Sequence, residues 1–90
     1  MQIKFSSETK KELKKIKRKD KRLAGKIEKQ LILFQKNPKH PSLRLHKLTG
    51  QFKNRWSISI TTNIRMIYLQ RDDEAYFIDI GTHDEVYKKN

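Results

Sequence analysis

The sequence predicts an α+β domain in which an N-terminal strand and a helical pair pack on a small antiparallel β-sheet. Apolar residues recur at helical spacing in the first half of the chain and alternate with polar residues in the second half, and a segment with both prolines separates the two. Helices followed by a run of strands are typical of α+β domains. The 90 residues suit a single domain, which we expect to span residues 1–90.

The N-terminal residues predict a strand that leads into a helix. In MQIKF, residues 1–5, apolar side chains alternate with polar ones, as in a short strand. Ser6 or Ser7 can then serve as the N-cap of a helix. Glu8 lies in the first turn, where the helix dipole stabilises an acid.

Two helices are expected before NPKHPS, residues 37–42, whose prolines end the second one. The first helix has a narrow apolar stripe, Leu13 and Ile16, and a broad lysine-covered face. Asp20 is either a second N-cap or a polar break, and Gly25 leaves the boundary open because glycine costs about 1 kcal/mol in a helix. The second helix buries residues spaced by four, four and three, which are Leu23, Ile27, Leu31 and Phe34.

Three strand-like segments follow the proline loop. Residues 55–61 alternate between apolar and polar side chains, which predicts a half-buried strand with one polar face. The segments 64–69 and 75–80 are two further strands, and the polar residues between them suit a hairpin connection. GTHDEVY, residues 81–87, then closes the sequence as a short C-terminal segment.

Basic charge points to a polyanionic partner. The chain has 22 Lys+Arg against 10 Asp+Glu, a net charge of +12, and residues 29–71 contain no acidic residue. The lysine-rich segment 10–22 is either a solvated helix face or a surface that contacts a phosphate backbone. A membrane-surface helix is poorly supported, because the apolar stripe lacks Trp.

The sequence argues against several classes of site. The sequence has no cysteine, so it can form neither a disulfide nor a thiolate metal site. The spacing of its three histidines, His40, His46 and His83, matches no compact zinc motif, and we expect no metal and no cofactor. The longest apolar run, residues 31–34, is too short for a membrane span, so a soluble cytoplasmic protein is expected.

Basic residues and two histidines near the predicted strands are candidates for phosphate chemistry. An arginine fork can donate two hydrogen bonds to one phosphate, although such residues can also simply keep a sheet edge soluble. The basic candidates are Lys47, Lys53, Arg55, Arg65 and Arg71. His46 and His83 each border a loop, and imidazole can transfer protons in either direction near neutral pH. His83 can alternatively be the polar cap of a last short helix.

Three segments carry a resemblance to a known family. They are LHKLTGQFKNRWSISI (45–60), IRMIYL (64–69) and IGTHDEVY (80–87). In this order and spacing they resemble the RelE/ParE superfamily of bacterial type II toxins, and especially the RelE-like mRNA interferases of the YafQ kind. The resemblance covers nearly the whole chain and implies a RelE-like microbial RNase fold.

The resemblance also implies a function and roles for individual residues. Such toxins are metal-free ribonucleases that cleave mRNA on the ribosome, and an antitoxin protein holds them inactive in a hetero-oligomer. His83 matches a general acid or base, His46 the histidine before the LTG turn, and Arg65 the arginine that binds the phosphate. Tyr87 matches an aromatic residue that orients or stacks on the nucleotide. Lys47, Lys53 and Arg55 are expected phosphate contacts by position and charge.

The chain departs from the YafQ pattern at three positions. Ser59, Asn63 and Ile64 stand where YafQ-like enzymes carry a histidine and an Asp-Trp pair. Serine alone cannot act as a base at neutral pH, so one proton-transfer role has moved to another residue or activity is absent. Two alternatives therefore stay open: a ParE-like inhibitor of DNA gyrase and a catalytically inactive RNA-binding relative. Retention of both matching histidines and of the arginine argues against the gyrase inhibitor.

Overall fold

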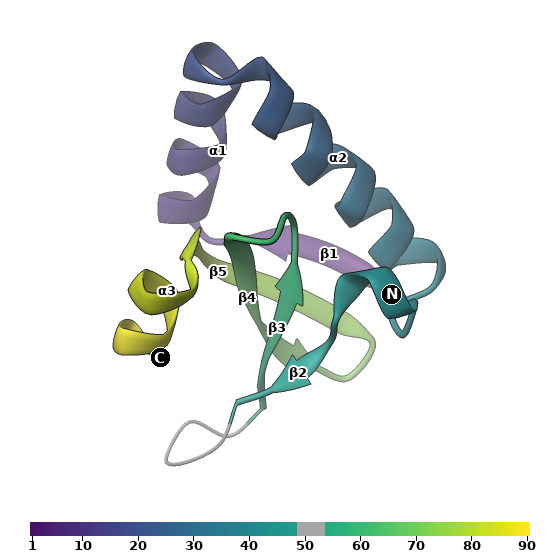
Figure 1. The fold of residues 1–90 in the computed structure, drawn as a ribbon. Coiled ribbons are helices and arrows are strands. Elements are labelled where there is room, and N and C mark those ends of the chain that lie inside the picture. Colours follow the sequence, from purple (N-terminus) through teal and green to yellow (C-terminus); the bar gives the residue numbers. More distant parts are fainter. Residues whose placement is uncertain (49–53) are drawn as a thin grey trace.

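The computed structural model describes residues 1–48 and 54–90 (Figure 1). Its helices are α1 (Ser7–Lys19), α2 (Lys21–Lys36) and α3 (His83–Lys89), with a 3-10 turn at Pro41–Leu43. Its strands are β1 (Gln2–Phe5), β2 (His46–Lys47), β3 (Arg55–Ser59), β4 (Ile64–Arg71) and β5 (Glu74–Thr82).

The five strands form one sheet in the order β1-β5-β4-β3-β2. β2 to β5 pair antiparallel with their chain neighbours, whereas β1 pairs parallel with β5, so the sheet is mixed. The predicted α+β class, with an N-terminal strand and a helical pair on a small sheet, is confirmed (Figure 1). β2 was not predicted, because two residues are too few to show a periodic pattern.

Side-chain caps fix the ends of both long helices. The Ser6 hydroxyl accepts a hydrogen bond from the Thr9 amide at 3.1 Å and starts α1. Asp20 ends α1 and also caps α2, because its carboxylate accepts a hydrogen bond from the Leu23 amide at 3.0 Å. The boundary that the sequence left open therefore falls at Asp20, and Gly25 lies within α2.

The face of the sheet toward α1 and α2 is an apolar core with an aromatic centre. Phe34 of α2 meets Tyr68 of β4 and Phe77 of β5 edge to face, with ring centroids 5.0 and 5.6 Å apart. All three rings are buried, and so is Ile27 on the predicted face of α2. The helical spacing read from the sequence therefore identifies the side of α2 that packs on the sheet.

Burial raises the pKa of Tyr68 to about 12, because the charged phenolate is disfavoured away from water. A raised pKa in the folded state gives stability that is complete below pH 10 and is lost as the pH rises toward about 12. We expect the free energy of unfolding to fall more steeply between these pH values in the wild type than in Tyr68→Phe. Urea unfolding of both proteins at a series of pH values checks this, and lysine titration, common to both, cancels in the difference. Parallel pH profiles would contradict the prediction.

The opposite face of the sheet is polar, but its centre is covered. The alternation in residues 55–61 predicts an exposed polar face, and here the structure differs, since Ser57 and Ser59 are both buried. The side chain of Arg65 and the helix α3 lie against this face, and Val86 of α3 is fully buried with Ile67 of β4. The polar side of β3 is thus interior, because the Arg65 side chain and Tyr87 of α3 lie against Ser57 while α3 itself packs on β4 and β5.

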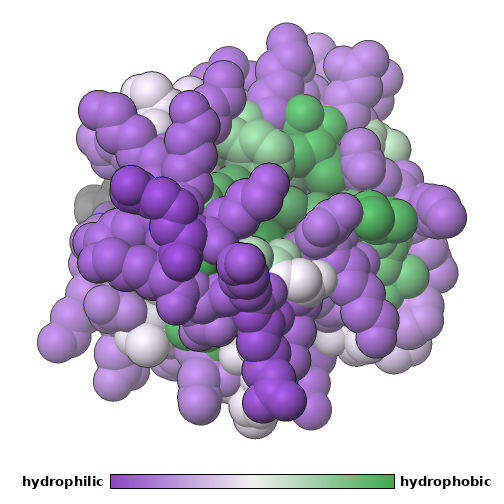
Figure 2. Space-filling view, turned by 90° about the horizontal axis from the view of Figure 1, so that it is seen from above, coloured by the Kyte–Doolittle hydropathy of each residue, from purple (hydrophilic) through white to green (hydrophobic). Residues whose placement is uncertain are grey.

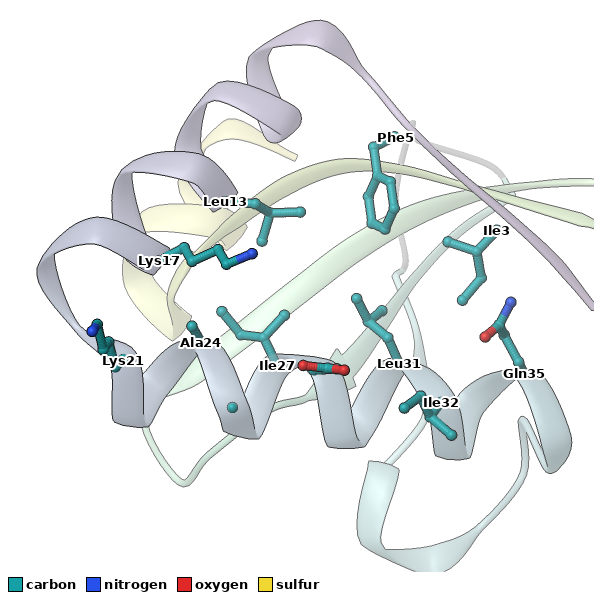
Figure 3. Close-up of a pocket in the computed structure, with 12 residues that line it drawn as sticks. Ile3, Phe5, Leu13, Lys17, Lys21, Ala24, Ile27, Leu31, Ile32 and Gln35 are labelled. Carbon is teal, nitrogen blue, oxygen red and sulfur yellow. The ribbon is translucent and has the colours of Figure 1, made fainter.

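A groove of about 630 Å³ lies between α1, α2 and β1 (Figure 3). Its floor is mostly apolar, and lysines stand at the end where the two helices meet. The apolar lining residues are Ile3, Phe5, Leu13, Ala24, Ile27, Leu31 and Ile32. Figure 2 shows hydrophobic side chains surrounded by hydrophilic ones on the face that carries α1 and α2. Within the described ranges, no helix is long and apolar enough to cross a membrane.

Candidate functional site

The helix α3 is held over the polar face of the sheet by its first turn and by one apolar anchor. The Thr82 hydroxyl accepts a hydrogen bond from the Glu85 amide at 3.3 Å, and the Glu85 carboxylate accepts one from the Thr82 amide at 2.8 Å. This backbone hydrogen bond lowers the pKa of Glu85. Seven residues are too few for a stable isolated helix, so α3 depends on this cap and on buried Val86.

Arg65 of β4 is fixed from two sides. Its Nε donates a hydrogen bond to the Ser57 hydroxyl at 2.5 Å, and its Nη2 donates one to the Arg44 carbonyl at 2.9 Å. Arg44 has a left-handed backbone, with φ of 46° and ψ of 50°, directly after the 3-10 turn. The guanidinium group is therefore oriented by the protein and still has N–H donors available for an anion.

Ser57 connects Arg65 with the C-terminal helix. The Tyr87 hydroxyl of α3 donates a hydrogen bond to the Ser57 hydroxyl at 3.1 Å. His46 of β2 pairs directly with Ser57 in the antiparallel register, so both side chains lie on the same face of the sheet. Ser57, whose hydroxyl links Arg65 with Tyr87, was not among the residues predicted from the sequence.

His83 is the first residue of α3 and is exposed to solvent. Its side chain is 65% exposed, and its Nδ1 lies 3.6 Å from a carboxylate oxygen of Asp84. Its ring meets the Tyr87 ring edge to face, with centroids 4.1 Å apart. The N-cap of α3 is Thr82, so the alternative that His83 caps the helix is wrong.

Four of the sequence-predicted residues thus form one chain of contacts and pairings. His83 contacts Tyr87, Tyr87 and Arg65 both bind Ser57, and His46 is paired with Ser57. The four come from β2, β4 and α3, and Ser57 from β3. Ser57 alternates on β3 with Trp56 and Ile58 of the core under α1 and α2, so this group lies on the other face of the sheet.

The residues predicted to contact phosphate lie at other positions than the four residues just described, or outside the described part of the chain. Arg55 of β3 donates a hydrogen bond to the side chain of Asn90, the C-cap of α3. The Asn90 side chain in turn donates to Asp79 at 3.1 Å. Lys47 faces the opposite side of the sheet from His46, and its Nζ lies 5.7 Å from the centre of the Trp56 ring. Lys53 lies outside the described residues.

The three positions that depart from the YafQ pattern build a turn. The Ser59 hydroxyl donates a hydrogen bond to the Thr61 carbonyl at 2.8 Å. The amides of Asn63 and Ile64 donate to the Thr61 hydroxyl at 3.2 and 3.0 Å. Each of these groups is engaged in closing the connection between β3 and β4. Across residues 1–48 and 54–90, no group of three or more His, Cys, Asp and Glu side chains is arranged to hold a metal ion.

Comparison with known proteins gives one family and a set of similar folds. The sequence model of the family described as "Bacterial toxin of type II toxin-antitoxin system, YafQ" matches residues 1–88. A YoeB/ParE toxin from Agrobacterium tumefaciens has a TM-score of 0.77 at 20% identity, covering 92% of this chain and 99% of that chain. YafQ from E. coli has a TM-score of 0.76 at 21% identity, covering 94% and 96%.

A third similar structure contains a bound partner. YafQ in the E. coli DinJ-YafQ toxin-antitoxin complex has a TM-score of 0.76 at 22% identity, covering 94% of each chain. At these identities the structural likeness establishes the fold alone. No significant match was found among curated proteins.

Proposed function

Because the chain belongs to the YafQ family of toxins from bacterial type II toxin-antitoxin systems, we propose that it is an mRNA endonuclease that acts on the ribosome and inhibits translation. One observation carries the proposal most directly. An oriented arginine, Arg65, shares the Ser57 hydroxyl with Tyr87, His83 packs against Tyr87, and His46 lies opposite Ser57 on the neighbouring strand. Such a group combines charge stabilisation with two side chains able to transfer protons.

The proposed reaction is an internal transesterification of RNA. The ribose 2′-OH attacks the adjacent phosphorus, its proton passes to a base, and an acid protonates the departing 5′-oxygen. The products are a 2′,3′-cyclic phosphate and a 5′-OH, so no water is consumed. We assign the two proton transfers to His46 and His83, because both are exposed histidines at the edges of the group.

Arg65 is assigned to the charge that builds up on the phosphate in the transition state. Its guanidinium is already held by Ser57 and Arg44, so little reorganisation is needed when the substrate binds. Tyr87 is assigned to orienting the nucleotide next to His83. Arg55 and Lys53 are proposed contacts for flanking phosphates, whereas Lys47, on the opposite face, can only meet a phosphate that passes the sheet edge.

Primer extension on a reporter mRNA in a purified translation system, with and without ribosomes, tests this function. Discrete cuts that require ribosomes support it. A folded protein that makes no cuts, but inhibits DNA supercoiling by gyrase, would favour the ParE-like alternative. A folded protein that does neither and still binds RNA would favour the inactive relative.

An antitoxin protein is the second part of the proposal. The chain's net charge of +12 and the apolar groove between α1, α2 and β1 suit an amphipathic segment with acidic flanks. Lys17 and Lys21 stand beside the apolar floor, where they can pair with such acids (Figure 3). A relative of known structure, YafQ of E. coli, was solved as a toxin-antitoxin complex.

Ile32 offers a direct test of this groove, because it lines the groove and is 45% exposed, so its replacement does not disturb the core. We expect Ile32→Glu to weaken the affinity for the cognate antitoxin by about tenfold or more, since it places a charge on apolar surface facing acidic residues. Ile32→Lys should weaken it less, because lysine keeps the attraction to those acids. Isothermal titration calorimetry measures both.

Lys29→Glu is the matched control, because Lys29 lies on α2 but does not line the groove. This control changes the net charge by more than Ile32→Glu does. If long-range charge alone governed the complex, Lys29→Glu would weaken binding more than Ile32→Glu, and the assignment of the groove would be wrong.

A further inference from the structure

We propose that Ser57 is a positioning residue of the site: its buried hydroxyl holds the guanidinium of Arg65 and the phenol of Tyr87 in place for the reaction. The inference rests on the proposed function, since it names a further residue of the same site. Ser57 needs no contact with the RNA for this role, because it acts through Arg65 and Tyr87.

Ser57 is a buried residue whose hydroxyl has two side-chain partners. Its exposed fraction is 0%, and its hydroxyl accepts hydrogen bonds from Arg65 Nε at 2.5 Å and from the Tyr87 hydroxyl at 3.1 Å. Ser57 is the strand partner of Ile67, which belongs to the apolar cluster with Leu48 and Val86 of α3. An apolar residue could fill this space, so the hydroxyl is explained by its two partners.

The hydroxyl links side chains from three different elements. Ser57 lies on β3, Arg65 on β4 and Tyr87 on α3. Arg65 is half-buried, and a flexible arginine at such a position loses rotamer freedom each time it binds a phosphate. Because Ser57 and the Arg44 carbonyl already fix the guanidinium, that ordering is complete before the substrate arrives.

Ser59 provides a matched control on the same strand. It is also a buried serine, two residues away, but its hydroxyl donates to the Thr61 carbonyl and closes a turn. Ser57→Ala and Ser59→Ala each remove one buried hydroxyl from β3. A purely structural role for Ser57 predicts similar effects of both variants on activity.

Single-turnover cleavage of ribosome-bound mRNA tests the proposal in four proteins: Ser57→Ala, Ser59→Ala, Arg65→Ala and the double variant Ser57→Ala/Arg65→Ala. We expect Ser57→Ala to lower the maximal cleavage rate by about 10-fold to 100-fold with little change in the half-saturating concentration, because geometry rather than binding is lost. Ser59→Ala should remain within about threefold of the wild type. In the Arg65→Ala background the Ser57 substitution should have only a small further effect.

Two results would overturn the proposal. One is an equal loss in Ser57→Ala and Ser59→Ala, and the other is a loss on Ser57→Ala that is just as large in the Arg65→Ala background. Circular dichroism of all four proteins separates either result from unfolding.

A second readout does not depend on cleavage. The Arg65 Nε–H group should give a distinct guanidinium signal in a ¹⁵N NMR spectrum of the wild type and of Ser59→Ala. This signal should be lost or averaged in Ser57→Ala. If the wild type cleaves no RNA, the proposed function fails, while this comparison still decides whether Ser57 orders Arg65. An unchanged Arg65 signal in Ser57→Ala would refute the positioning role.

Discussion

Replacing Arg65 by alanine is expected to lower the rate of mRNA cleavage by about 10²-fold to 10³-fold, the range seen when one preorganised donor to a developing negative charge is removed. The effect is large because Arg65 is already oriented by Ser57 and the Arg44 carbonyl. Arg65→Lys keeps the charge but lacks the planar fork, so we expect it to recover only a small part of the loss. Single-turnover cleavage of ribosome-bound mRNA measures all three proteins.

Arg71→Ala is the matched control for this prediction. Arg71 lies at the other end of β4, where its guanidinium carbon is 5.0 Å from the centre of the Tyr76 ring. We expect this variant to cleave at close to the wild-type rate. A similar loss in both arginine variants would mean that general basic charge, rather than the oriented group at Arg65, governs activity.

Replacing His83 by alanine is expected to lower the cleavage rate by about 10²-fold or more, which is typical for loss of a general acid or base. His83 is suited to proton transfer because its side chain is exposed and Tyr87 packs against its ring. The pH-rate profile of the variant should lose one of its two limbs. Cleavage rates of wild type and variant across pH 5 to 9 check this.

His40 supplies the control for the histidine prediction. Its Nδ1 accepts a hydrogen bond from the Ser42 amide at 3.1 Å in the proline-containing loop, and it takes no part in the group around Ser57. His40→Ala should cleave like the wild type. If His83→Ala kept both the rate and the pH profile, the acid-base assignment would be wrong and His46 would have to carry the proton transfers with another partner.

Local patterns in the sequence account for most of the fold. The spacing of apolar residues identifies the buried side of α2, alternation identifies β3, and two strand-like runs around a polar connection identify β4 and β5. The parallel pairing of β1 with β5 joins Gln2 to Glu74 across most of the chain, and no local pattern encodes such a pairing. Alternation likewise shows that Ser57 and Ser59 share a face but not that α3 and Arg65 cover it.

The site was predicted only in part, for similar reasons. His83, His46, Arg65 and Tyr87 are predicted from a resemblance in motifs. In the structure Arg65 and Tyr87 bind the Ser57 hydroxyl, His83 contacts Tyr87, and His46 is the strand partner of Ser57. Ser57 carries no motif, because a serine in a strand usually signals an exposed position. The one sequence feature that marks Ser57 is its alternation with apolar residues on a strand near two basic candidate residues, Arg55 and Arg65. His46 and Lys47 point to opposite faces of the sheet because successive side chains alternate along a strand.

The chemical nature of the RNA ends made by the wild-type protein tests the central claim most directly. Cleaved mRNA from a purified translation system can be digested and its ends identified by mass spectrometry. The arrangement of His46, Arg65 and His83 predicts a 2′,3′-cyclic phosphate on the upstream fragment and a 5′-OH on the downstream fragment. A 3′-OH with a 5′-phosphate, or intact mRNA in the presence of folded protein, would contradict it.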